Sequence, residues 1–150
     1  MSGGPATALR GLSGDGDARV LLTGSHIGTV VHGGAYDGAL GVLSAIVAVE
    51  ACAATGGAPR RTVEVVSLCE EESSRFHCNY FGTPPHPLDA GPRTVLQQAA
   101  DAGGASWRDL PSGAGHDSQT MGTCVAAAML FVPSIDGRSP SPAEYSTPED

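Results

Sequence analysis

One pattern between residues 18 and 68 constrains the fold of this chain more than any other feature. The apolar run at residues 18–23 predicts a buried strand, which leads into a glycine-rich loop that carries His26. Residues 38–55 are apolar on nearly every side and predict a helix that is buried against a sheet, and Gly56-Gly57 ends it. Residues 62–68 predict a second strand. These elements form a βαβ unit, so we expect parallel strands joined by a right-handed crossover.

Side chains that can bind a metal follow both predicted strands. His26 lies beyond the first strand, Asp37 lies directly before the helix, and Glu70-Glu71-Glu72 follow the second strand. The carboxyl ends of parallel strands are where α/β sheets build their sites, and imidazole and carboxylate groups suit Zn²⁺ or Mn²⁺. Each feature also has a plain structural interpretation, as a helix cap at Asp37, a loop histidine and a solvated acidic run. Three adjacent carboxylates repel one another, which favours a bound cation.

The composition excludes several classes of function. The 150 residues allow one domain with a real core, and the net charge of −8 argues against nucleic acid or an anionic membrane as a partner. The eight basic residues are all arginine, which excludes lysine Schiff-base chemistry. The glycine-rich loop lacks the phosphate-binding signatures, and Ser112 lies in no G-x-S-x-G elbow.

The cysteines and the hydrophobic pattern indicate a cytoplasmic protein. The four cysteines form no C-x-x-C pair, so we expect reduced thiols rather than a zinc ribbon or a disulfide framework. The first twenty residues show no secretory signal, and we expect no transmembrane segment because Glu50 interrupts the apolar helix.

The remainder of the chain is less regular. Residues 1–17 predict a disordered lead, and residues 83–92 form a junction rich in proline and glycine. Helices are expected at 93–102 and 118–126, a strand at 127–132, and the start of a helix at 147–150. The predicted fold class is therefore α/β, with a mixed, mainly parallel sheet flanked by helices.

Several blocks in order resemble a known family: Gly24-Ser25-His26, residues 34–42, residues 69–76, residues 110–117, residues 129–134, residues 141–145 and residues 147–150. They are similar to the allantoate amidohydrolase and N-carbamoyl-L-amino-acid hydrolase family of the zinc aminoacylase–carboxypeptidase clan. The resemblance implies an incomplete zinc-exopeptidase-like catalytic domain at 18–150, truncated because the family's lid and dimerisation domain is missing near 83–92. The family's dimer is therefore not expected.

The resemblance also implies roles for individual residues. Asp37 would bridge two Zn²⁺ or Mn²⁺ ions, while His26 and Glu72 would each hold one of them. Glu71 would be the general base, since the family's glutamate pair precedes a stretch that Ser73-Ser74-Arg75-Phe76 matches. The loop Gly113, Ala114, Gly115 and His116 would bind substrate through backbone amides and the imidazole. The alternative for that loop is a tight turn before a helix capped by Asp117.

Three departures from the family pattern bear on activity. Gly28 stands where the family has an aspartate that orients the histidine, Pro140 stands where it has a late histidine, and a third family histidine lies in the missing segment. Each of two metals would keep two protein ligands against the usual three. His77 is a possible substitute ligand.

The resemblance implies hydrolysis of a linear amide or ureido C–N bond, as in allantoate or N-carbamoyl-L-amino acids, and we expect that activity to be impaired. The alternative is a non-catalytic remnant or pseudoenzyme.

Overall fold

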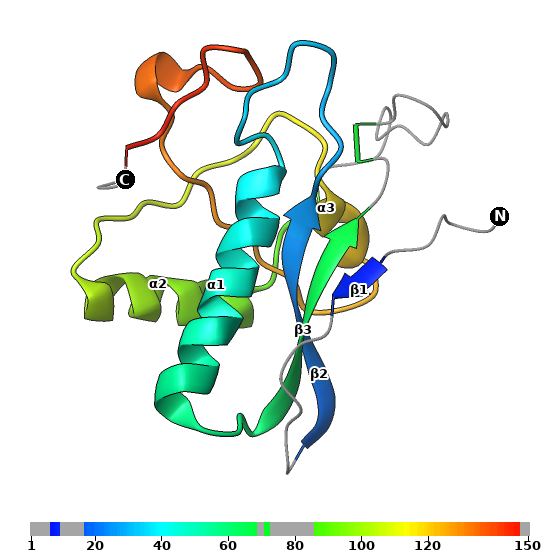
Figure 1. Cartoon of the computed structure of the whole chain (residues 1–150), viewed down its shortest axis with the longest axis vertical. Coiled ribbons are helices and arrows are strands. Elements are labelled where there is room, and N and C mark those ends of the chain that lie inside the picture. The colour runs from blue at the N-terminus through cyan, green and yellow to red at the C-terminus, as the bar shows by residue number, and fades with distance from the viewer. Residues whose placement is uncertain (1–6, 10–16, 69–70, 73–85, 148–150) are drawn as a thin grey trace, which may run out of the picture. The chain divides into compact units, whose positions relative to one another are not determined.

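The computed structural model describes residues 7–9, 17–68, 71–72 and 86–147, which fall into two compact units (Figure 1). The first unit comprises Met1–Cys78 and Pro133–Asp150, and the second comprises Asn79–Val132. The first unit contains strands β1 (Thr7–Leu9), β2 (Asp17–His26) and β3 (Arg61–Leu68), helix α1 (Ala39–Gly56) and the short 3₁₀ helix η1 (Ile135–Gly137). The second unit contains helices α2 (Ala90–Gly103) and α3 (Asp117–Met121).

The described strands form one mixed sheet in the order β1-β3-β2. Strands β2 and β3 are parallel, and their register runs from Val20 opposite Thr62 to His26 opposite Leu68. This pairing confirms the predicted βαβ unit and the mixed, mainly parallel sheet. The register also ends β2 and β3 at the same edge of the sheet, which is the edge where the candidate metal ligands follow.

Strand β1 pairs antiparallel with β3, from Thr7 opposite Ser67 to Leu9 opposite Val65. The prediction of a disordered lead across residues 1–17 is therefore wrong for this strand and for Asp17, where β2 begins. Composition could not show it, because β1 is held by backbone hydrogen bonds to β3, and backbone groups are the same in every sequence.

Helix α1 packs against β2 and β3, and the core of the first unit lies between them (Figure 1). Val42, Ala45 and Val65 are buried there. This packing confirms the prediction of a helix against the sheet, but the side chains of Leu43 and Val47 remain 61% and 63% exposed. A helix that is apolar on nearly every side is fully buried only when other elements pack against both of its faces. The sheet covers one face of α1.

Helix α1 also meets the length and composition test for a membrane span, against our expectation that no segment would. Its 18-residue window has a mean hydropathy of 1.8, and 11% of that window is buried. Core helices of soluble proteins pass the same test.

Truncating Val65 is expected to destabilise the first unit. Val65 is 2% exposed in the central strand, so Val65→Ala removes two buried methyl groups and should cost about 2 kcal/mol of unfolding free energy. Val47→Ala on the exposed face of α1 is the matched control and should change stability by less than about 0.5 kcal/mol. Urea denaturation followed by circular dichroism measures both, and equal effects would show that this core is not where the structure places it.

The second unit departs more from expectation. Helix α2 begins three residues before the predicted 93–102 helix, with Asp89 as its N-cap. The Asp89 N–H donates to the Ala127 carbonyl at 3.0 Å, and the Ala127 N–H donates to Asp89 Oδ2 at 3.2 Å.

The strand predicted at 127–132 is not formed, because its first residue pairs with the start of helix α2 rather than with a strand. Helix α3 is shorter than the predicted 118–126 helix and ends at Met121. Residues 148–150 of the predicted final helix lie outside the described residues.

Candidate metal centre

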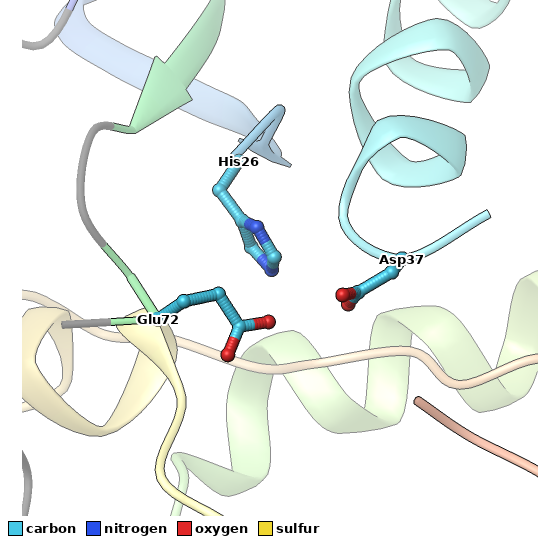
Figure 2. Close-up of side chains that lie close together, drawn as sticks. All are labelled: His26, Asp37 and Glu72. Atoms are coloured by element: carbon cyan, nitrogen blue, oxygen red, sulfur yellow. The ribbon is translucent and has the colours of Figure 1, made fainter. Parts of the chain in front are cut away.

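Three side chains predicted from the sequence to bind metal converge in the first unit (Figure 2). His26 is the last residue of β2, Asp37 lies in the loop before α1, and Glu72 follows β3. One potential ligand atom from each lies within 4.8 Å of the other two, and all three side chains are half-buried. The strands bring them together because β2 and β3 end side by side. His26 itself is in the strand rather than in the glycine-rich loop where we expected it.

The Asp37 side chain is held by the loop and does not cap the helix. The N-cap residue of α1 is Gly38, and no side chain donates or accepts a hydrogen bond there, so the predicted cap is wrong. Asp37 Oδ2 instead accepts a hydrogen bond from the Thr29 hydroxyl at 2.6 Å. Thr29 was not singled out from the sequence, because a contact across eight loop residues follows no periodic pattern.

Gly38 explains how the imidazole and the helix start come so close. Its φ is 65°, in the left-handed region that glycine adopts without strain, and a Cβ there would collide with the imidazole of His26. A glycine at this position is therefore needed to bring Asp37 beside His26.

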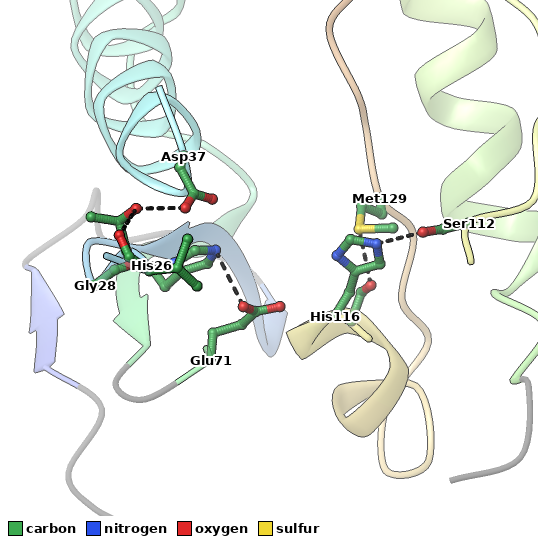
Figure 3. A network of polar contacts seen from close by, with 10 residues as sticks. His26, Gly28, Asp37, Glu71, Ser112, His116 and Met129 are labelled. Carbon is green, nitrogen blue, oxygen red and sulfur yellow. Dashed lines mark hydrogen bonds and ion pairs between the residues drawn. The ribbon is translucent and has the colours of Figure 1, made fainter. Parts of the chain in front are cut away.

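The orientation of the His26 ring follows from one backbone contact. Nδ1 of His26 lies 2.7 Å from the carbonyl oxygen of Gly28, and a carbonyl can only accept, so Nδ1 carries the hydrogen (Figure 3). The lone pair of the neutral ring is then on Nε2, which is the nitrogen available to a metal. Gly28 lacks the carboxylate that the resemblance places here, but its backbone carbonyl accepts the Nδ1 hydrogen and thereby orients the ring.

Glu71 lies beside the same imidazole. Glu71 is 9% exposed, and its Oε2 is 3.6 Å from His26 Nε2 (Figure 3). The general-base candidate is therefore a buried carboxylate next to the nitrogen that would bind the metal. Its neighbour in sequence, Glu72, belongs to the converging group. Glu70 and His77, the acidic neighbour and the substitute ligand considered from the sequence, lie outside the described residues.

The pKa of Glu72 is raised above its ordinary value. Burial is the largest cause, followed by the charge of Asp37 and a hydrogen bond between the two carboxyl groups, while the charge of His26 acts in the opposite direction. A divalent cation between the two carboxylates would remove this repulsion. One imidazole nitrogen and two carboxylates fit a single Zn²⁺ or Mn²⁺ with three protein ligands. Among the described residues this group offers no third ligand for each of two ions bridged by Asp37.

The raised pKa predicts a pH effect on the metal-free chain. The folded state keeps a proton on Glu72 at pH values where the unfolded state has lost it, so stability falls as pH rises from the ordinary value of 4.5 through the raised one. Glu72→Gln should flatten this decline, and Glu50→Gln on exposed helix surface should not. Denaturation in a chelating buffer between about pH 4.5 and 8 compares the three proteins. A decline in Glu72→Gln that is as steep as in the unmodified chain, or steeper, would contradict the assignment.

The predicted substrate loop lies in the second unit. Ser112 Oγ is 2.7 Å from His116 Nε2 and accepts a hydrogen bond from the Ala114 N–H at 3.2 Å. Helix α3 begins at Asp117 with His116 as its N-cap, so the alternative in which Asp117 caps the helix is wrong. The roles predicted for Gly113, Ala114, Gly115 and His116 remain predictions.

The sequence analysis predicted no role for Glu144, which lies close to the loop before Asp37. It accepts a hydrogen bond from the Ser139 hydroxyl at 3.1 Å, and its side chain occupies the space beside Gly34, in the loop that leads to Asp37. The segment around Pro140 therefore belongs to the same unit as the metal-binding group, although proline offers no ligand atom.

A family model described as Peptidase family M28 matches residues 9–144. The chain belongs to peptidase family M28. Relatives of this M28 chain include the allantoate amidohydrolase of Bacillus subtilis (strain 168), 58% identical over 64 residues, which cover 43% of the chain and 16% of that protein. The allantoate amidohydrolase of Escherichia coli (strain K12) is 44% identical over 96 residues, which cover 64% of the chain and 23% of that protein. The N-carbamoyl-L-amino acid amidohydrolase of Geobacillus stearothermophilus is 34% identical over 101 residues, which cover 67% of the chain and 24% of that protein.

These matches confirm the resemblance drawn from the sequence blocks. The M28 chain spans between 16% and 24% of the length of these three relatives.

Proposed function

We propose that this chain carries the metal centre of a hydrolase that cleaves linear amide or ureido C–N bonds, with allantoate or N-carbamoyl-L-amino acids as substrates, and that its activity is impaired. The observation that carries the proposal is the convergence of His26, Asp37 and Glu72 within 4.8 Å. The names of the similar amidohydrolases support the choice of bond and substrate.

His26 Nε2 and the carboxylates of Asp37 and Glu72 would hold one Zn²⁺ or Mn²⁺ ion. When bound, such an ion polarises a substrate carbonyl and lowers the pKa of a bound water. The chain's part is to fix these three groups: Gly28 sets the imidazole tautomer, and Thr29 holds the Asp37 carboxylate. The second ion of the family's pair is not part of this proposal, because the described group supplies three ligands.

Glu71 would act as the general base. Its carboxylate is buried and lies 3.6 Å from His26 Nε2, so it is close to the reacting centre and shielded from bulk water. It would take a proton from the attacking water and pass it to the leaving nitrogen. The loop formed by Gly113, Ala114, Gly115 and His116 would bind the substrate's polar groups.

Impairment follows from what the site lacks. Pro140 has no side-chain lone pair to replace the family's late histidine, and a site without the family's lid would exclude water poorly. We also propose that the family's lid and dimerisation domain is deleted near residues 83–92, and that the family's dimer therefore does not form. We also propose a cytoplasmic location, which the free thiols of Cys52 and Cys124 support.

The second candidate is a non-catalytic remnant of the family. The substitution of proline at position 140 favours it, because a site that has lost a ligand can retain weak metal binding without turnover. The remnant would keep the same metal site as the hydrolase, but Glu71 would not act as a general base in it.

Metal titration combined with a hydrolysis assay separates the two candidates. The unmodified chain and Glu71→Gln are saturated with Zn²⁺ or Mn²⁺, and amine or ammonia release from allantoate and N-carbamoyl amino acids is measured. Slow hydrolysis that Glu71→Gln abolishes without loss of metal identifies a hydrolase. Metal binding with no hydrolysis in either protein identifies the remnant, and the absence of metal binding refutes both.

A further inference from the structure

Ser112 and His116 form a polar pair in the second unit that the metal centre does not use (Figure 3). Ser112 Oγ is 2.7 Å from His116 Nε2, and the Ala114 N–H donates to the same oxygen at 3.2 Å. Ser112 is exposed, while His116 is half-buried. The serine therefore contacts both the backbone of the glycine-rich loop and the imidazole at its end.

The pattern of donors indicates where the serine proton lies. Ser112 Oγ already accepts one N–H, and among the described residues its hydroxyl has no acceptor other than His116 Nε2. If the hydroxyl donates to Nε2, all of these groups are paired, and the hydrogen of the neutral ring must be on Nδ1. If Nε2 carried the hydrogen, Oγ would accept twice and the hydroxyl would be left to water.

The ring is also held from a second side. The rings of His116 and Phe131 meet edge to face, with centroids 5.4 Å apart and planes at 69°. Phe131 restricts the tilt of the imidazole, and Ser112 distinguishes its two nitrogens.

We infer that Ser112 is a positioning residue that holds His116 in the tautomer with hydrogen on Nδ1. Any carboxylate or carbonyl oxygen that the neutral ring binds must then approach Nδ1. This consequence rests on the proposed function, in which His116 contacts the substrate, whereas the tautomer itself is a property of the free chain.

Nitrogen NMR of the full chain labelled with ¹⁵N-histidine tests the tautomer directly. His116→Gln identifies the His116 signals. We expect a protonated Nδ1 and an unprotonated Nε2 at neutral pH. Ser112→Ala should shift the ring toward the Nε2–H form that an unconstrained imidazole favours, and Ser112→Thr should restore the original signals because it keeps the hydroxyl.

Ser141→Ala is the matched control. Ser141 Oγ accepts the Ala143 N–H at 3.1 Å, which is the same two-residue contact without an imidazole, so this variant should leave the His116 signals unchanged. A protonated Nε2 in the unmodified chain, or signals unaffected by Ser112→Ala, would overturn the inference.

A ligand titration separates this inference from the proposed function. N-carbamoylglycine is the probe, and loss of one hydrogen bond should weaken its binding to Ser112→Ala by about 2- to 13-fold. Unchanged affinity together with the expected tautomer change would refute the substrate role of His116 and leave the positioning role of Ser112 standing.

Discussion

Asp37→Asn is expected to weaken Zn²⁺ binding by at least about tenfold, or ~1.4 kcal/mol. Asp37 is one of the two carboxylates of the group, and the amide keeps the size of the side chain and an oxygen for the Thr29 hydroxyl. The substitution therefore removes the negative charge while preserving the loop. Competition with a chromophoric chelator measures the affinity.

Two variants serve as controls for this loss. Glu50→Gln removes a carboxylate from the exposed surface of α1 and should leave Zn²⁺ affinity unchanged. His32→Asn alters an exposed imidazole in the loop before Asp37, at a φ of 64° that asparagine tolerates. Equal affinities for Asp37→Asn and either control would exclude the proposed site.

Restoring the two family residues is expected to strengthen metal binding far more than it restores hydrolysis. Gly28→Asp alone should change Zn²⁺ affinity little, because the Gly28 carbonyl already accepts the His26 Nδ1–H and nothing lies within 4 Å of an added Cβ. Pro140→His adds a ligand where proline offers none, so a larger gain should come from this substitution. Turnover of allantoate should stay low in the double variant, because an added ligand would not supply the water-excluding lid that we propose this chain lacks.

The single and double variants are compared in one titration and one rate assay. A large gain from Gly28→Asp alone would show that the backbone carbonyl does not support the imidazole. Fast hydrolysis by the double variant would show that the ligand at position 140, rather than the proposed loss of the lid, limits the reaction.

The features predicted correctly from the sequence are those that depend on local pattern. Apolar runs of the right length predicted β2, α1 and β3, and the rule that parallel strands end at one edge predicted the approach of His26 to Glu72. The same reasoning failed at 127–132, where an apolar run has no strand partner. Hydrophobicity predicts burial, but it does not show whether another strand is available to pair.

The errors at the candidate metal centre have a different cause. We expected side chains to do what backbone groups do here: the Gly28 carbonyl orients His26, and Gly38 takes the N-cap position assigned to Asp37. Backbone donors and acceptors are nearly the same at every residue. The sequence therefore does not show which backbone group will contact a particular side chain. The Thr29 contact with Asp37 was missed because it depends on the path of the loop.

The positions of the three candidate ligands along the chain mean that a bound ion would also stabilise the fold. They come from the end of β2, the loop before α1 and the segment after β3, so one ion would cross-link three stretches of backbone between residues 26 and 72. Binding energy in such an arrangement is also folding energy. In the first unit, where helix α1 leaves Leu43 and Val47 exposed, a bound ion would therefore add rigidity that packing against the sheet alone does not supply.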